Sequence, residues 1–294
     1  MEQKLLEKMK TGKGFIAALD QSGGSTPNAL KLYGIEESAY SNEEEMYNLI
    51  HEMRTRIITS PVFNSDSILG AILFKQTMEN TIDDEYTADY LLRKGILPFL
   101  KIDVGLDVLE DDVQIMKSIP ELEELLKKAV KYNIFGTKMR SVINGSNQKG
   151  IKKVVKQQFE LAKQIIANDL IPIIEQEVDI NISDKEEAEK ILKDELFNEV
   201  AKLDKNDKII FKLTLPSQEN FYKDLISEEH TLRVVALSGG YSREDACKIL
   251  AKNEGVIASF SRAFTNGINV NQTEEEFNST LEKSIKAIYE ASNS

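Results

Sequence analysis

Short apolar runs rich in β-branched residues alternate along the chain with longer amphipathic segments. Each run is continuous and shows no alternation of apolar and polar residues, which is typical of strands buried on both faces. We expect eight strands, at residues 15–19, 68–74, 96–102, 134–139, 170–178, 208–213, 232–237 and 256–260. Helical spacing is found between them, at residues 43–59, 121–132, 152–168 and 184–203.

This alternation of strand and helix predicts parallel strands joined by helical crossovers. Eight strands in 294 residues fit a (β/α)8 (TIM) barrel better than a doubly wound sheet, which has fewer strands and usually a Gly-rich dinucleotide turn. The sequence contains no such turn, no Pro/Gly/Ser-rich linker and no low-complexity tract. We therefore expect an α/β fold in which residues 1–294 form a single (β/α)8 barrel domain.

Composition narrows the classes of partner. A hydrophobic content of 41% is enough for one large core. Forty-nine acidic against 37 basic residues give a net charge of -12, which disfavours a nucleic-acid partner. Residues 1–10 mix charged and apolar positions, so we expect a cytoplasmic protein with no membrane partner. Cys247 is the single cysteine, which excludes an internal disulfide.

Polar residues stand at the end of every expected strand. A barrel keeps its chemistry at the carboxyl ends of its strands, and alternation places residues two apart on the same face. A structural rim of salt bridges is the alternative explanation, but it accounts for one Lys–Glu pair better than for a complete ring. The ring consists of Asp20, Lys75, Lys101 with Asp103, Lys138 with Arg140, Glu175 with Glu177, Lys212, Ser238 and Arg262.

Lysines and carboxylates in one water-poor cavity favour imine chemistry. Like charge and desolvation both disfavour the ammonium form of a lysine, so its amine becomes a nucleophile toward a ketone. Glu175 and Asp20 are the available bases for proton transfer. Spacing alone leaves four candidate nucleophiles, which are Lys75, Lys101, Lys138 and Lys212.

Two glycine-containing turns indicate phosphate binding. Residues 238–240 follow the seventh strand and Arg262 ends the eighth, where barrels commonly hold phosphate. Residues 22–25 follow the first strand, with Lys101 nearby in barrel order. Two phosphate sites at opposite sides of one mouth predict a bisphosphate substrate.

Metal-dependent cleavage of a carbon–carbon bond would require clustered ligands such as histidines. The chain has two histidines, His51 and His230, which are far apart in sequence and away from the strand ends. We expect both to be surface or packing residues, and we expect neither a metal nor a cofactor.

Seven segments, in order, resemble the class I fructose-1,6-bisphosphate aldolases, and the resemblance runs from Gly14 to about Phe264. It implies a reversible, metal-independent lyase of glycolysis that cleaves fructose 1,6-bisphosphate to dihydroxyacetone phosphate and glyceraldehyde 3-phosphate. The shorter chain favours a bacterial-type member. The segments are ALDQSGGS (18–25), LKID (100–103), GTKMR (136–140), PIIEQE (172–177), FKLTLP (211–216), LSGG (237–240) and FSRA (260–263).

The family pattern also implies roles for individual residues. Lys212 matches the Schiff-base lysine, and Glu175 resembles the main acid and base of proton transfer. Their charged partners are Glu177, Lys138 and Asp20. The residues that match the phosphate site next to the ketone are Ser238, Gly239 and Arg262. Those that match the other phosphate end are Ser22, Ser25, Lys101 and Arg140.

The chain departs from the animal enzymes at three points. Its C-terminus has Tyr289 within an expected last helix and no terminal tyrosine, Gln21 stands where they have an acid, and Tyr241 where they have glutamine. Two alternative functions are considered beside this one. One is an imine-forming aldolase for another sugar phosphate, such as tagatose 1,6-bisphosphate, and the other is a non-catalytic barrel that binds sugar phosphates. The oligomeric state is left open.

Overall fold

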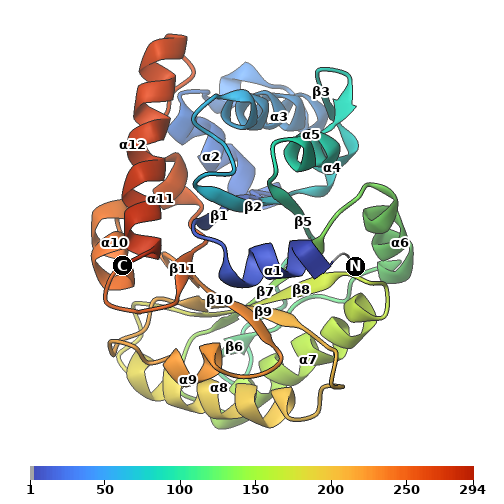
Figure 1. The fold of residues 1–294 in the computed structure, drawn as a ribbon, viewed down its shortest axis with the longest axis vertical. Helices are drawn as coiled ribbons and strands as arrows, with labels where there is room; N and C mark the ends of the chain where they lie inside the picture. The colour runs from blue at the N-terminus through green and yellow to red at the C-terminus, as the bar shows by residue number, and fades with distance from the viewer. Residues whose placement is uncertain (1–2) are drawn as a thin grey trace.

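A computed structural model describes residues 3–294 and has a nearly closed parallel barrel at its centre (Figure 1). The last strand approaches the first through a hydrogen bond from the Ala18 N–H to the Phe260 carbonyl, at 3.4 Å. The predicted (β/α)8 barrel is confirmed, and each of the eight expected strands is present. In barrel order they are β1 (Phe15–Leu19), β2 (Ile68–Leu73), β5 (Leu97–Lys101), β7 (Gly136–Ile143), β8 (Ile171–Val178), β9 (Ile209–Thr214), β10 (Thr231–Leu237) and β11 (Ile257–Ala258).

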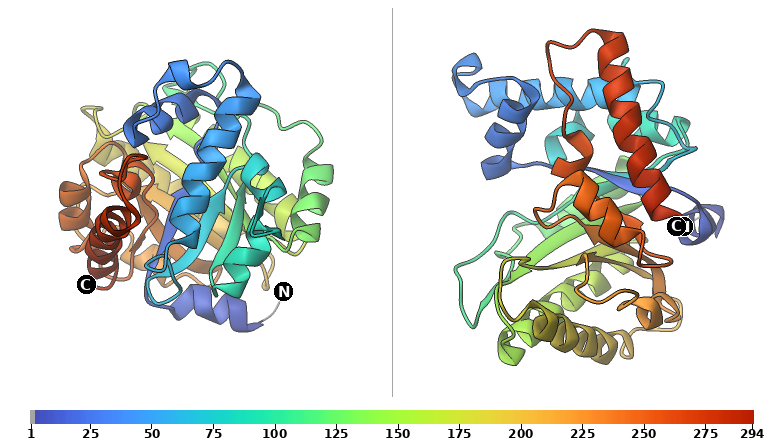
Figure 2. Two further views of the ribbon diagram at one scale, coloured as in Figure 1. Left: turned by 90° about the horizontal axis from the view of Figure 1, so that it is seen from above. Right: turned by 90° about the vertical axis from the view of Figure 1, so that its left-hand side faces the viewer.

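Helices flank the strands on opposite sides in both views of Figure 2. The four helices expected from the sequence correspond to α3, α6, α7 and α8. No helix in residues 3–294 has the length and apolar character needed to cross a membrane. The helices are α1 (Gln3–Thr11), α2 (Thr26–Tyr33), α3 (Glu43–Thr59), α4 (Lys75–Glu79), α5 (Thr87–Arg93), α6 (Leu122–Lys131), α7 (Gln148–Ile166), α8 (Lys185–Val200), α9 (Lys223–Ile226), α10 (Arg243–Leu250), α11 (Arg262–Thr265) and α12 (Glu274–Ser292).

Strand β7 is longer than its apolar run predicts. The apolar run stops at Met139, but the strand continues to Ile143. The run underestimates the strand because Arg140, like Lys138, is a polar residue that faces the cavity inside the barrel. The extension also pairs antiparallel with the short strand β6 (Val113–Gln114). A small hairpin, β3 (Thr81–Ile82) with β4 (Glu85–Tyr86), lies between α4 and α5. The apolar pattern predicted neither β6 nor this hairpin.

An apolar layer inside the barrel supports the polar strand ends. Its members include Ala18, Phe99, Ile173 and Ile210, and Met9 of α1 joins it from the amino end of the strands. Helix α1 lies across that end in Figure 1. Since alternate side chains of a strand share a face, the residue two positions beyond each of these strand residues also faces inward. Those four residues are Asp20, Lys101, Glu175 and Lys212.

Phe99 is the largest side chain of this layer that lies within a strand, and we predict that Phe99→Ala lowers the free energy of unfolding by about 3–5 kcal/mol. Its ring is fully buried and packs edge-on against Phe135, with 5.4 Å between ring centroids. Urea unfolding followed by circular dichroism measures the change. Val108→Ala is the matched control, because that side chain is 77% exposed and should contribute little. Equal effects of the two substitutions would contradict the proposed supporting layer.

Candidate active site

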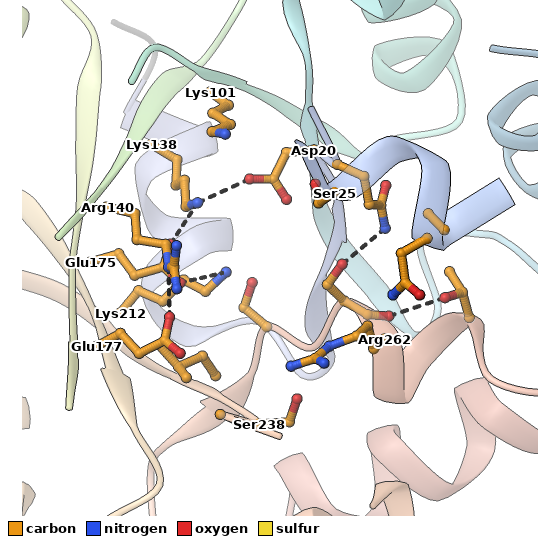
Figure 3. Close-up of a pocket in the computed structure, with 18 of the residues that line it drawn as sticks. Asp20, Ser25, Lys101, Lys138, Arg140, Glu175, Glu177, Lys212, Ser238 and Arg262 are labelled. Carbon is orange, nitrogen blue, oxygen red and sulfur yellow. Dashed lines mark hydrogen bonds and ion pairs between the residues drawn. The ribbon is translucent and has the colours of Figure 1, made fainter. Parts of the chain in front are cut away.

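A cavity of about 410 Å³ opens at the carboxyl ends of the strands (Figure 3). All five side chains predicted as catalytic line it, as do six of the seven predicted phosphate-binding residues. The exception is Ser22, which does not line the cavity. The predicted residues that line the cavity are Asp20, Lys138, Glu175, Glu177, Lys212, Ser25, Lys101, Arg140, Ser238, Gly239 and Arg262.

Strand register brings the reactive side chains together. Arg140 on β7 is aligned with Glu175 on β8, and Glu175 is aligned with Lys212 on β9. Lys101 on β5 is likewise aligned with Lys138 on β7. Neighbouring parallel strands lie about 4.8 Å apart, so a side chain can reach an aligned partner on the same face, as Lys212 reaches Glu175, or one offset by two residues, as Lys138 reaches Glu175.

Lys138 forms the centre of a buried ion-pair cluster. Its Nζ lies 2.7 Å from Glu175 Oε2 and 3.0 Å from Asp20 Oδ2. Burial alone would lower the pKa of Lys138, but the charges of Asp20 and Glu175 outweigh it and raise that pKa above its ordinary value. Burial likewise opposes ionisation of Asp20 and Glu175, yet Lys138 and Lys212 hold both carboxyl pKa values below normal. All three groups are therefore charged near neutral pH.

Lys212 has a different electrostatic environment. Its side chain is buried, and its Nζ lies 3.6 Å from Glu175 Oε1, which is the longer of the two lysine contacts of that carboxylate. Burial lowers the pKa of Lys212, the charge of Glu175 opposes this change, and the charge of Lys138 adds to it. The lowered pKa increases the fraction of free amine, and a carboxylate stands beside it to move protons.

Two further ion pairs form the wall next to this cluster. Arg140 Nε donates to Glu177 Oε2 at 2.6 Å. Lys101 Nζ donates to Ser22 Oγ at 2.5 Å and lies 3.4 Å from Asp103 Oδ1. Ser22 therefore contacts Lys101 without lining the cavity, whereas Ser25 lines the cavity itself.

The turn after β10 requires glycine for its backbone conformation. Gly239 has a φ of +59°, and a Cβ there would lie 2.8 Å from Ile180 Cγ2. The turn is closed by a hydrogen bond from the Tyr241 N–H to the Ser238 carbonyl at 2.9 Å. Ser238 and Gly239 share the cavity wall with Arg262, at the start of α11. In Figure 3, Ser238 and Arg262 lie across the cavity from Lys138, and a phosphate between them would be separated from the ion pairs.

Several polar residues considered from the sequence lie elsewhere. Lys75 begins α4 and does not line the cavity, because the chain turns into a helix directly after β2. His51 contacts the Thr81 carbonyl at 3.1 Å and His230 the Asp207 carbonyl at 3.0 Å. Tyr289 packs in α12 against the outer core.

Some lining residues were not predicted from the sequence. Asn28 and Leu32 of α2 and Thr265 of α11 lie on helices that follow strand ends, and Ser259 and Ser261 flank the short last strand. The sequence signal that could have identified them is their position within a few residues of a strand end. In total, five cationic and three carboxylate side chains line the cavity of a chain whose net charge is -12. The excess of cations suits a phosphorylated substrate.

Comparisons with known proteins agree on one family. The family model for class I fructose-bisphosphate aldolase matches residues 3–220. A protein of Clostridium acetobutylicum, named fructose-bisphosphate aldolase class 1, is 58% identical over 293 residues, which cover 99% of each chain. A Plasmodium falciparum fructose-bisphosphate aldolase, solved with TRAP and a small-molecule inhibitor, has the same fold. It aligns with a TM-score of 0.71 at 17% identity and covers 100% of this chain and 97% of its own.

We predict that Lys138→Met lowers the free energy of unfolding by about 3–5 kcal/mol near pH 7, and that the loss shrinks toward pH 5. In the parent protein the pKa values of Asp20 and Glu175 are lowered, so their stabilisation persists down to acid pH. Without Lys138, both carboxyls lose their nearest cation, so burial raises their pKa values relative to the parent protein, although Lys212 still opposes the change. The loss relative to the parent then shrinks as falling pH protonates the carboxyls of the variant.

Thermal unfolding of both proteins at the two pH values measures this difference. Lys153→Met is the control, because Lys153 pairs with Glu110 at the exposed surface. That variant should show little change at either pH. A loss from Lys138→Met that is constant with pH would exclude unpaired carboxylates as its cause.

Proposed function

Because the chain belongs to the class I fructose-bisphosphate aldolase family, we propose that it cleaves its substrate through a Schiff base on Lys212. The family membership makes the protein a lyase that converts fructose 1,6-bisphosphate to dihydroxyacetone phosphate and glyceraldehyde 3-phosphate. The observation that carries the imine proposal is the contrast between two buried lysines. The pKa of Lys212 is lowered, whereas that of Lys138 is raised.

The proposed reaction begins when the free amine of Lys212 attacks the C2 carbonyl of the substrate. A carbinolamine forms and loses water, with Glu175 as the nearest acid and base, 3.6 Å from the Lys212 nitrogen. The C3–C4 bond then breaks. Its electrons pass into the iminium to give an enamine, and a carboxylate accepts the proton of the C4 hydroxyl. Glyceraldehyde 3-phosphate leaves, the enamine is protonated at C3, and hydrolysis releases dihydroxyacetone phosphate and the free lysine.

The other charged residues hold this arrangement in place. Lys138 keeps a fixed positive charge between Asp20 and Glu175, so it stabilises negative charge that develops near the leaving hydroxyl. Glu177 anchors Arg140. These contacts support the roles that the sequence analysis expects for Lys138 and Glu177.

The phosphate groups of the substrate are assigned to opposite sides of the cavity. Ser238, Gly239 and Arg262 bind the phosphate next to the ketone, where backbone N–H groups and a guanidinium suit a dianion. The far phosphate is bound by Lys101, Arg140 and Ser25, with Ser22 supporting Lys101. Five cations against three carboxylates support binding of two phosphates in one cavity.

We further infer that residues 1–294 act as one catalytic domain, of which residues 1–2 lie outside the described part. The contiguous outer core that joins the strands to their helices supports this inference. We also place the reaction in cytoplasmic glycolysis, because the matching family model describes a class I fructose-bisphosphate aldolase.

The alternative substrate is a C4 epimer such as tagatose 1,6-bisphosphate. The same imine and the same two phosphate sites serve either sugar, and the two differ only where the C4 hydroxyl meets the wall. The ratio of kcat/KM for the two sugars separates these substrates. A silent sugar-phosphate binder is disfavoured, because Lys212 and Glu175 are both present and in contact.

We predict that borohydride reduction in the presence of dihydroxyacetone phosphate and EDTA leaves a single adduct on Lys212. Borohydride reduces an imine to a stable secondary amine, so the chain gains the mass of dihydroxyacetone phosphate plus two hydrogens and minus one water. Intact mass spectrometry and peptide mapping locate the adduct. Lys212→Met should abolish both the adduct and cleavage.

Lys75→Met is the matched control, because Lys75 follows a strand but lies outside the cavity lining. It should keep the adduct and the activity. If no adduct forms and EDTA abolishes cleavage, the imine proposal is wrong and a metal carries the reaction. If neither adduct nor cleavage is found without EDTA, the silent binder is favoured instead.

We predict that Lys101→Met and Arg262→Met differ in their substrate dependence. Loss of one charged hydrogen bond costs about 1.5–3 kcal/mol, or roughly 10- to 100-fold in kcat/KM. Arg262→Met should show this loss with both fructose 1,6-bisphosphate and fructose 1-phosphate. Lys101→Met should show it only with the bisphosphate. Steady-state kinetics with the two sugars test the assignment. The opposite pattern would mean that the two groups of residues bind the opposite phosphates.

A further inference from the structure

Arg54 is a fully buried cation behind the cavity wall. It lies in α3 and has no exposed surface. Its guanidinium donates to Thr77 Oγ1 at 2.7 Å, to the Gln21 carbonyl at 2.5 Å and to Gln21 Oε1 at 3.3 Å. Within residues 3–294, all of its hydrogen-bond partners are therefore neutral oxygens.

Burial of this charge contributes little to stability by itself. Burial lowers the pKa of Arg54 to about 10, although the charge of Asp20 opposes the change, so the guanidinium is still charged at neutral pH. A buried charge without a directly paired carboxylate costs desolvation energy, and an apolar side chain of similar volume often serves the fold as well or better. A role at the active site would explain an arginine at this position.

The hydrogen bonds of Arg54 connect α4 to two segments that line the cavity. Gln21 directly follows Asp20 after β1, and Thr77 lies in α4 after β2. Gln21 Nε2 in turn donates to Ser261 Oγ at 2.9 Å. Ser261 precedes Arg262 and also lines the cavity. One guanidinium therefore fixes the position of a catalytic carboxylate and, through Gln21, that of a phosphate-binding arginine.

We propose that Arg54 is a positioning residue of the aldol cleavage, which acts through Gln21 to hold Asp20 and Arg262 at a fixed separation. The proposal rests on the function proposed above, because that function gives Asp20 and Arg262 their roles. A displacement of about 1 Å in a catalytic group can cost roughly 100-fold in rate. Arg54 touches neither the cavity nor the substrate, so its effect reaches the reaction only through these contacts.

The test is Arg54→Met, which keeps the apolar stem and most of the volume but removes the fork of donors. We expect kcat for fructose 1,6-bisphosphate to fall and KM to rise, with kcat/KM reduced about 10- to 100-fold. A purely structural role gives another pattern. Partial unfolding reduces the concentration of active enzyme, which lowers apparent kcat and leaves KM unchanged.

Arg233→Met is the matched control. Arg233 is partly buried, and its contacts, like those of Arg54, are neutral oxygens, here the carbonyls of Met9 at 2.9 Å and Gly12 at 2.6 Å. It lies near the start of β10, at the end of the barrel opposite the cavity. Arg233→Met should lower the melting temperature at least as much as Arg54→Met while leaving kcat and KM unchanged. Equal kinetic losses in the two variants would overturn the proposal.

A double-mutant cycle tests the route through Gln21. Gln21→Met removes the amide that joins Arg54 to Ser261 and keeps the side-chain volume. If Arg54 acts through Gln21, the losses of Arg54→Met and Gln21→Met in kcat/KM should combine to less than their product. A full product of the two losses would exclude this route.

Two controls separate failure of the inference from other failures. If Arg54→Met does not fold, Arg54→Lys replaces it, since lysine retains the charge but cannot reach Thr77 and Gln21 with one planar fork. We then expect an intermediate loss with the same rise in KM, and unchanged kinetics would overturn the proposal. Borohydride trapping of the parent protein tests the imine separately, so the role of Arg54 can fail while the Lys212 adduct forms.

Discussion

The contact of Lys138 with two buried carboxylates is the interaction on which the site depends. Neither Asp20 nor Glu175 would ionise readily in this water-poor cavity without a cation within 3.0 Å. The same contact keeps Lys138 protonated, which makes it unsuited to nucleophilic attack. Its fixed charge also disfavours a second ammonium on Lys212, whose pKa burial already lowers. One ion-pair cluster thus shifts the pKa values of two lysines of identical chemistry in opposite directions.

The ion-pair cluster depends in turn on strand register. Arg140, Glu175 and Lys212 occupy aligned positions on three successive strands. A slip of one residue in any of these strands would turn its charged side chain out of the cavity and toward the outer helices. The apolar layer beneath prevents such a slip, because Ile173 and Ile210 would leave the barrel interior at the same time. The packing that stabilises the barrel and the alignment that forms the site therefore both depend on the same alternation of side-chain direction along the strands.

The strands and most of the residues that line the cavity could be predicted from the sequence. Strands buried on both faces form continuous apolar runs, and the polar residues that follow them were placed at the mouth by the barrel fold alone. The choice between Lys138 and Lys212 depends on distances between side chains of different strands, which spacing along the chain does not contain. Only the family resemblance named Lys212 at that stage. Lys75, one of the four lysines that spacing left open, does not line the cavity because the chain turns into α4 directly after β2.

Arg54 illustrates what the sequence pattern could not predict. It lies within a helix next to other charged residues, where an arginine is usually solvent-exposed. Its contacts reach Gln21 and Thr77, which lie 33 and 23 positions away in sequence, and both become its neighbours only in the folded chain, where β1 pairs with β2. The helical pattern of α3 records which face is buried but not which polar group that face must meet. A buried polar residue on a helix that covers a catalytic strand end is thus informative only once the tertiary contacts are known. In this chain, those contacts connect the outer helical layer to the cavity wall beside Asp20 and beside Arg262.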